Sequence, residues 1–173
     1  MPPATQVSLA EYRNTDYEPD CDYVDGVLEE RYVSKKRHSR TQIRLAQWLA
    51  SRESEHHHVV LISQRVQVSP TRVRVPDICM VVPDDHDEIA QTPPVVWIEI
   101  LSPEDSWSRV QTKLQDCQSF GVRNIWIIDP YSNQAWIATF DSAAAPVTNG
   151  RLRCAELRLD VPLVEILPKA AKV

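Results

Sequence analysis

Residues 95–101 read Val-Val-Trp-Ile-Glu-Ile-Leu, an apolar run that contains a single acid, Glu99. A continuous run of this kind is typical of a central strand that is covered on both faces. A helical pattern follows at residues 102–121, and residues 124–130 form a second short apolar run that ends at a proline. Strand, helix and strand at this length predict a right-handed parallel crossover. The sequence therefore predicts an α/β fold, a central mixed β-sheet flanked by helices.

The helix of this crossover carries its own start and stop signals. Residues 102–105 read Ser-Pro-Glu-Asp, which predicts Ser102 as the N-cap and Pro103 at the first helical position. Gly121 is the expected C-terminal cap. The residues expected to form the buried stripe of this helix are Trp107, Val110, Leu114 and Cys117.

The remaining elements follow from shorter patterns. Residues 23–32 predict a hairpin with Asp25-Gly26 in its turn, and residues 39–50 predict a helix. Ile43, Ala46, Leu49 and Ala50 recur at helical spacing there, with Leu45 and Trp48 widening the stripe. Further strands are expected at residues 59–68 and 73–82, a closing hairpin at 134–140 and 151–159, and a last short element at 163–167.

The composition predicts one ordinary globular domain spanning residues 1–173, with residues 1–20 as an N-terminal arm. Apolar residues make up 43% of the 173 and charged residues 25%. No run approaches the roughly 20 apolar residues that cross a bilayer, and the N-terminus shows no signal-peptide pattern, so no membrane partner is expected. The four cysteines are widely spaced, which makes a zinc site unexpected and favours a cytoplasmic location.

The charges are unevenly placed along the chain. The net charge of −5 argues against a strongly basic protein that coats nucleic acid. Residues 31–52, however, hold seven basic residues and no acidic one. Candidate nucleic-acid contacts in this stretch are Lys35, Lys36, Arg37, His38 and Arg40. The alternative is a solvated helix face.

Two acids, Asp77 and Glu99, are set into apolar strands. A hairpin centred near Glu88 would place them opposite each other, with Cβ atoms roughly 5 Å apart. Carboxylates at that separation repel unless a proton or a cation lies between them, and Mg²⁺ suits such oxygen ligands. The pair therefore suggests a metal site. The alternatives are a Pro-Asp turn for Asp77 and an ion pair between Glu99 and Arg65 or Arg74.

Lys113 is the best candidate for a third charged partner. It lies in the helix that leaves the strand of Glu99, about 40° around that helix from Cys117. Lys113 would thus stand at the edge of the buried stripe and lean over the sheet. A cation there could stabilise the negative charge that develops when water attacks a phosphate.

At this point the chain resembles a known family. Pro76-Asp77 followed by Glu99-Ile100-Leu101 looks like the PD-(D/E)XK motif of restriction-endonuclease-like nucleases. Residues 23–26, 28–31, 38–39, 74–77, 98–105, 113 and 120–130 together resemble the Uma-two group of endonucleases. The resemblance covers about residues 20–140. Leu101 stands where the motif's lysine would be, and in the Uma-like group that lysine is moved to the following helix, which matches Lys113.

The resemblance implies a Mg²⁺-dependent endonuclease that hydrolyses phosphodiester bonds, with DNA as the expected substrate and Mn²⁺ as an alternative metal. Asp77, Glu99 and the backbone carbonyl of Ile100 would hold the metal, and Lys113 would orient the attacking water. The family also carries an acid that matches Glu30, with Glu29 as its rival. The family pattern favours Glu30, which would bind the metal or a water in its shell. A homodimer would suit the cutting of two strands.

Two other readings stay open. The fold could serve as a nucleic-acid-binding or protein-binding module with little or no catalysis. It could also be a structural protein in which an arginine neutralises Asp77 and Glu99. His56-His57-His58 is a weaker metal candidate, because adjacent histidines cannot all face one ion.

Overall fold

A six-stranded mixed sheet forms the centre of the computed structural model, which describes residues 6–32, 34–83 and 87–168. From edge to edge its strands are β10 (Ser142–Pro146), β9 (Gln134–Thr139), β8 (Asn124–Asp129), β7 (Val96–Ile100), β6 (Ile78–Val81) and β3 (Val59–Ile62). β7 and β8 run parallel, and the other neighbours run antiparallel. The predicted fold class and the parallel pairing are both confirmed.

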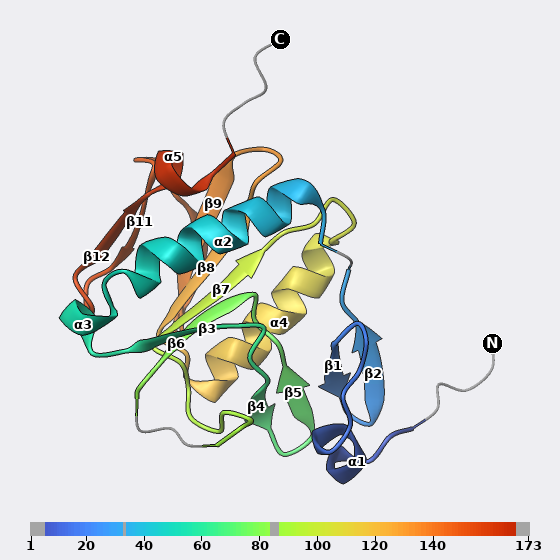
Figure 1. Cartoon of the computed structure of the whole chain (residues 1–173). Helices are drawn as coiled ribbons and strands as arrows, with labels where there is room; N and C mark the ends of the chain where they lie inside the picture. Colours follow the sequence, from blue (N-terminus) through green and yellow to red (C-terminus); the bar gives the residue numbers. More distant parts are fainter. Residues whose placement is uncertain (1–5, 33, 84–86, 169–173) are drawn as a thin grey trace.

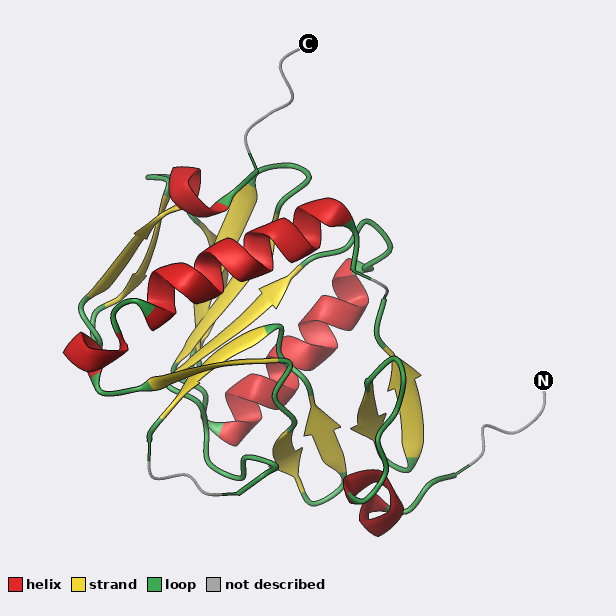
Figure 2. Cartoon of the chain, viewed as in Figure 1, coloured by secondary structure: helices red, strands yellow, loops and turns green. Residues whose placement is uncertain are grey.

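Two long helices cover opposite faces of this sheet, α2 (Lys36–Ala50) in front and α4 (Trp107–Phe120) behind (Figures 1 and 2). Alternate side chains of a strand point to opposite faces. Ile98 and Ile100 of β7 accordingly pack in one core with Leu45 of α2. Trp97 packs in the other core with Leu114 of α4. Glu99 is two residues from Trp97 and therefore points to the same face of the sheet, toward α4.

Smaller elements surround the central sheet. A second sheet contains, in order, β2 (Val27–Glu30), β1 (Cys21–Val24), β5 (Arg72–Arg74) and β4 (Val66–Ser69), and α1 (Leu9–Arg13) precedes it in the chain. A third pairs β11 (Arg151–Cys154) with β12 (Leu159–Pro162). The helices α3 (Glu53–His56) and α5 (Leu163–Ile166) are one turn each. Residues of β11, β12 and α5 close the core beneath α2.

The predicted register between the two acidic strands is confirmed. Ile78 pairs with Ile98, which places residues 77 and 99 at the next opposed position. Asp77 donates its backbone N–H to the Ile98 carbonyl oxygen at 3.1 Å, so the ladder continues to that point. The two acids thus lie at the same end of neighbouring strands.

Two predicted strands are each broken into two. Residues 59–68 divide into β3 and β4 at Ser63, which has a φ of +51°. Residues 73–82 divide into β5 and β6 at Pro76-Asp77, because proline has no N–H for the ladder. β4 and β5 join the second sheet, while β3 and β6 join the central one. Asp77 therefore lies at a bend between sheets rather than within a strand.

The helix α4 begins later than predicted, at Trp107 rather than at Pro103. The expected capping groups form a separate turn, because the Ser102 N–H donates to Asp105 Oδ2 at 2.7 Å. Ser106 is the N-cap instead, and its Oγ accepts from the Arg109 N–H at 3.3 Å. The predicted C-cap, Gly121, is confirmed with a φ of +96°.

The buried faces of the two long helices differ in part from the predicted stripes. Trp107 is exposed, although Val110, Leu114 and Cys117 are buried as predicted. In α2 the buried residues are His38, Thr41, Leu45 and Leu49, whereas Ile43 is 52% exposed. The helix is therefore rotated relative to the apolar stripe, and polar residues of its first turns face inward.

The predicted closing hairpin is wrong. β9 turns directly into β10 at Phe140-Asp141, and β11 pairs with β12. Thr139 and Ser142 tie the first turn, since their hydroxyl oxygens lie 2.6 Å apart and Thr139 Oγ1 donates to Asp141. No glycine marks this turn, which explains why the pattern placed it later in the chain.

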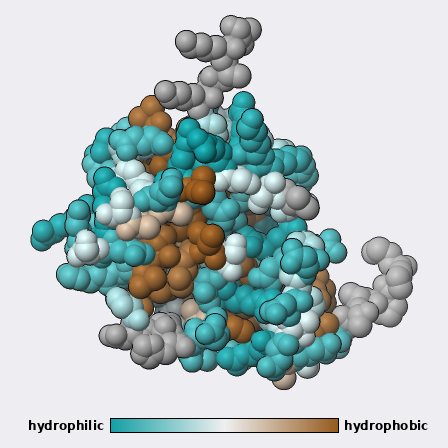
Figure 3. All heavy atoms as spheres, in the orientation of Figure 1, coloured by the Kyte–Doolittle hydropathy of each residue, from teal (hydrophilic) through white to brown (hydrophobic). Residues whose placement is uncertain are grey.

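One edge strand of the central sheet is β3. Ile62 on this strand and Val82 just after β6 are exposed apolar side chains. An apolar area also lies below α2 on the face shown in Figure 3. The Val60 N–H donates to Glu53 Oε1 at 2.7 Å, so a carboxylate caps part of the edge.

All four cysteines are buried and unbridged, and Cys117 lies in the core as its place in the helical stripe predicts. Within the described ranges, no helix has the length and apolar character needed to cross a membrane.

Candidate active site

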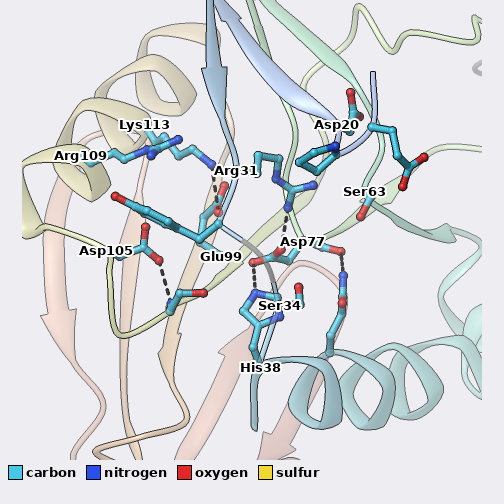
Figure 4. A pocket seen from close by; sticks show the side chains of 15 residues that line it. Asp20, Arg31, Ser34, His38, Ser63, Asp77, Glu99, Asp105, Arg109 and Lys113 are labelled. Atoms are coloured by element: carbon cyan, nitrogen blue, oxygen red, sulfur yellow. Dashed lines mark hydrogen bonds and ion pairs between the residues drawn. The ribbon is translucent and has the colours of Figure 1, made fainter. Parts of the chain in front are cut away.

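A pocket of about 320 Å³ opens where the ends of β6 and β7 meet α2 and α4 (Figure 4). Three of the four predicted catalytic residues, Asp77, Glu99 and Lys113, line it. The other ionisable residues of the lining are Glu18, Asp20, Arg31, Tyr32, His38, Asp105 and Arg109. The pocket is therefore strongly polar and contains both acids and bases.

Asp77 is fixed by its backbone at the bend between β5 and β6. Its carbonyl oxygen accepts from Gln42 Nε2 at 2.9 Å and from the Ser63 N–H at 3.2 Å. With its own N–H bound to Ile98, Asp77 is held by α2, by β7 and by the loop after β3. The backbone is thus anchored on three sides before the side chain makes any contact.

The Asp77 carboxylate is 6% exposed and fully hydrogen-bonded. Oδ1 accepts from Arg31 Nη2 at 2.7 Å, and Oδ2 accepts from the Ile100 N–H at 2.7 Å. His38 Nε2 lies 3.2 Å from Oδ2 (Figure 4). Burial works to raise the pKa of Asp77, but His38, Arg31 and the Ile100 N–H outweigh it and lower the pKa. Asp77 is therefore a carboxylate at neutral pH.

Glu99 lies on the α4 side of β7. Its Oε1 accepts from Trp97 Nε1 at 2.9 Å, and its Oε2 lies 3.4 Å from Lys113 Nζ. Burial raises the pKa of Glu99, and the nearby charges of Asp77 and Asp22 add to the effect against the opposing Lys113. Of the two acids, Glu99 is the one whose charge lacks full compensation.

Lys113 reaches the pocket from α4 with only 12% of its side chain exposed. Its Nζ lies 3.3 Å from Asp22 Oδ2 as well as 3.4 Å from Glu99 Oε2. Burial disfavours the ammonium, yet Asp22 and Glu99 outweigh it and raise the pKa of Lys113. Lys113 therefore stays charged and can donate hydrogen bonds, but it cannot act as a base.

Asp22 is a residue of this cluster that sequence reasoning missed. It is fully buried on β1, where Oδ1 accepts from the Val75 N–H at 3.0 Å and Oδ2 lies 3.1 Å from Arg74 Nη1. Burial opposes its charge, but Lys113 and Arg74 prevail and lower the pKa of Asp22. The signal was available, since Asp22 stands between Cys21 and Tyr23 in a short strand.

The structure does not bring Glu30 to the pocket. Asp22 pairs directly with Glu29 across β1 and β2, so those two share a face and Glu30 points to the other. Glu30 is exposed, and Glu29 binds Arg74 Nη1 at 2.7 Å. The acid that approaches Lys113 from this hairpin is therefore Asp22.

The predicted basic patch divides into two parts. Lys35, Lys36, Arg37 and Arg40 are exposed on and before the first turns of α2. His38 instead is buried against Asp77. Lys35 forms an ion pair with Glu104, and Arg37 donates to the carbonyl oxygens of Pro130 and Tyr131.

The predicted arginine partners of Glu99 pair with other acids. Arg65 binds Asp20, and Arg74 binds Asp22, Glu29 and Asp116. An arginine does enter the site, but it is Arg31 and it pairs with Asp77.

The oxygen atoms that this pocket offers are of the kind that binds a hard divalent cation. Asp77 and Glu99 supply carboxylate oxygens, and Asp77 already binds one cation, the Arg31 guanidinium. Among the described residues, no three His, Cys, Asp or Glu side chains form a ready-made metal cluster, and this holds for His56-His57-His58 too. A metal here would therefore rely on few protein ligands, as Mg²⁺ usually does.

Comparison with known proteins identifies the family of this chain and a solved structure with a similar fold. A family model described as "Putative restriction endonuclease" matches residues 9–159. A solved structure titled as a "putative nuclease belonging to DUF820" from Anabaena variabilis ATCC 29413 superposes with a TM-score of 0.81 at 19% identity, covering 92% of this chain and 97% of that one. That likeness shows the fold. Comparison with curated protein sequences gives no match.

Proposed function

Because the chain belongs to the Uma2 family of restriction-endonuclease-like proteins, we propose that it is a metal-dependent endonuclease that hydrolyses phosphodiester bonds in DNA. The observation that carries the proposal is the meeting of Asp77, Glu99 and Lys113 in one pocket. These residues come from a bend, a strand and a helix, and they match the family's motif. The unbridged cysteines suit a cytoplasmic enzyme.

Asp77, Glu99 and the backbone carbonyl of Ile100 would hold Mg²⁺, or Mn²⁺ in its place. When bound, the ion would lower the pKa of an attacking water and stabilise negative charge on the phosphate. His38 and the Ile100 N–H orient the Asp77 carboxylate. The low pKa of Asp77 keeps this ligand ionised at neutral pH.

Lys113 would donate a hydrogen bond to the attacking water or to a phosphate oxygen. Its raised pKa keeps it charged, so its contribution is electrostatic rather than that of a base. Asp22 also binds the ammonium and acts as a positioning residue. The buried Arg74 in turn holds Asp22.

DNA would approach over the start of α2. Lys35, Lys36, Arg37 and Arg40 are exposed there, next to the pocket that contains His38 of the same helix. Phosphate contacts of this kind position a duplex and make binding depend on salt. The overall charge of −5 implies a local contact rather than a long basic groove.

A cleavage assay with matched variants tests the proposal. Linear, supercoiled, single-stranded and branched DNA are incubated with Mg²⁺ or Mn²⁺ and wild-type protein, Glu99→Gln, Lys113→Ala or the control Glu156→Gln. Glu156 is an exposed partner of Arg123, so its loss should not affect cleavage. We expect Glu99→Gln and Lys113→Ala to lower the rate by about 100-fold or more.

The other outcomes are equally informative. Cleavage that survives in both site variants would indicate a contaminating nuclease and remove the support for this site. No cleavage and no metal binding would favour the alternatives without catalysis, either a binding module or a structural protein in which Arg31 neutralises Asp77.

A further inference from the structure

Arg31 contacts the proposed metal ligand directly. Its Nη2 donates to Asp77 Oδ1 at 2.7 Å, and among the described residues this is its one hydrogen bond. The side chain descends from the end of β2 and meets Asp77 from the side opposite His38 (Figure 4). It is 18% exposed, so it keeps contact with the open part of the pocket.

The charges of the pocket explain why an arginine lies there. Asp22, Asp77 and Glu99 bring three carboxylates together, and Lys113 lies between two of them. Without Arg31, the Asp77 carboxylate would retain, among the described residues, only His38 and the Ile100 N–H as partners. A buried carboxylate without a charged partner is costly, so Arg31 stabilises the metal-free protein.

A divalent cation would change this balance. A metal on Asp77 would lie within a few ångströms of the guanidinium, and two cations at that distance repel strongly in a buried site. Both also require the same oxygen, Oδ1, unless the carboxylate rotates away from Ile100 and His38. Arg31 and the metal therefore compete for Asp77.

We propose that Arg31 is an exchangeable counter-ion: it holds Asp77 until a divalent cation replaces it, and the freed guanidinium then binds a phosphate oxygen of the DNA. The inference rests on the proposed function, because it requires the metal site. The planar guanidinium suits both partners, since carboxylate and phosphate present the same pair of oxygens to it.

Arg74 shows what a permanent counter-ion looks like in the same protein. It is 1% exposed and binds three carboxylates, those of Asp22, Glu29 and Asp116. Within the described part of the chain, Arg31 has one ion-pair partner, and 18% of its side chain is exposed. Arg31 can therefore leave its carboxylate at far lower cost than Arg74 can.

Metal affinity is the first test. Mn²⁺ binding to the full chain is measured by calorimetry for wild type, Arg31→Ala and the control Arg109→Ala. Arg109 lines the same pocket, but its contacts are the Glu30 carbonyl oxygen and the Tyr32 ring rather than a carboxylate. We expect Arg31→Ala to bind Mn²⁺ about tenfold tighter or more, and Arg109→Ala to change affinity by less than about threefold. Metal-free Arg31→Ala should also melt at a lower temperature than wild type.

DNA affinity is the second test, with Ca²⁺ as a metal that permits binding without turnover. Anisotropy of a labelled duplex oligonucleotide should show that Ca²⁺ tightens binding to wild type. Arg31→Ala should bind Ca²⁺ yet gain little DNA affinity from it. Arg109→Ala should lose affinity equally with and without Ca²⁺.

The outcomes distinguish a failure of the Arg31 exchange from a failure of the proposed nuclease function. Equal Mn²⁺ affinity in wild type and Arg31→Ala would overturn the exchange while leaving the metal site intact. An equal gain in Mn²⁺ affinity in Arg31→Ala and Arg109→Ala would show that any lost positive charge has this effect. That result would overturn the exchange as well. No Mn²⁺ binding by any of the three proteins would overturn both the exchange and the metal-dependent nuclease.

Discussion

Replacing Asp22 by asparagine tests whether a buried charge cluster holds Lys113. The substitution keeps the side-chain shape, and the asparagine oxygen can still accept from the Val75 N–H. The negative charge alone is lost. Lys113 and Arg74 would then each lose a carboxylate that lies 3.3 Å and 3.1 Å away.

The size of the effect follows from burial. Removing one partner of a buried ion pair typically costs about 3–5 kcal/mol. Lys113 keeps Glu99, and Arg74 keeps Glu29 and Asp116, so the loss should fall below that range. We expect Asp22→Asn to lower the free energy of unfolding by about 2–3 kcal/mol, a fall in Tm of about 5–10 °C for a chain of this size.

Urea unfolding followed by the fluorescence of the five tryptophans measures the loss. The pH dependence of this loss shows whether it comes from the charge of Asp22. Because the folded-state pKa of Asp22 is lowered, its charge stabilises the protein above the unfolded-state pKa, near 3.9, and that stability is lost as the pH falls through the folded value. The difference between wild type and Asp22→Asn should thus be full at neutral pH and shrink below about pH 4.

Asp160→Asn is the matched control. Asp160 also binds two arginines, Arg151 and Arg153, but its side chain is 44% exposed. Solvent screens such pairs, so the loss should be far smaller. Equal losses in the two variants, or a difference that persists unchanged into acid, would refute a buried cluster around Lys113.

Two further predictions concern stability. Burial, with help from Asp77 and Asp22, raises the folded-state pKa of Glu99, so stability falls as the pH rises from the unfolded value toward the folded one. Glu99→Gln should therefore raise the Tm of the metal-free protein near pH 8 and leave it unchanged near pH 4, and a lower Tm near pH 8 would contradict this. Leu45→Ala should cost about 2–5 kcal/mol in urea unfolding, because Leu45 is fully buried on the side of α2 that faces the sheet. Ile43→Ala should cost less than about 1 kcal/mol, since Ile43 is exposed, and the reverse order would mean that α2 has the orientation the apolar stripe predicts.

The central part of the fold could be predicted because local patterns determine it. The apolar run around Glu99, the glycine that ends α4 and the second run at β8 together fix a parallel crossover. The opposition of residues 77 and 99 followed from the simple symmetry of a hairpin. Lys113 enters the same pocket because α4 follows the strand that carries Glu99 and packs against the sheet.

The rest of the site depends on contacts between distant segments. Arg31 and His38 reach Asp77 across 46 and 39 residues of sequence, and no local pattern encodes such a meeting. The strand break at Ser63 likewise follows from the separation into two sheets, whereas Pro76 is a local signal for the break at Asp77. Ile43 shows the same limit, since an apolar residue at helical spacing can still face solvent when polar neighbours bind a buried carboxylate.

The placement of Glu99 on β7 and Lys113 on α4 has a mechanical consequence. In the E-X-K arrangement of the superfamily motif both groups stand on one strand, and covalent geometry fixes their spacing. Here the spacing depends on how α4 rests on the sheet, through Leu114 and Cys117 against Trp97. Changing the volume of a side chain in that contact would shift the helix and retune the distance between acid and ammonium without touching either. The distance between Glu99 and Lys113 can thus be changed by substitutions in the core, without any substitution in the pocket.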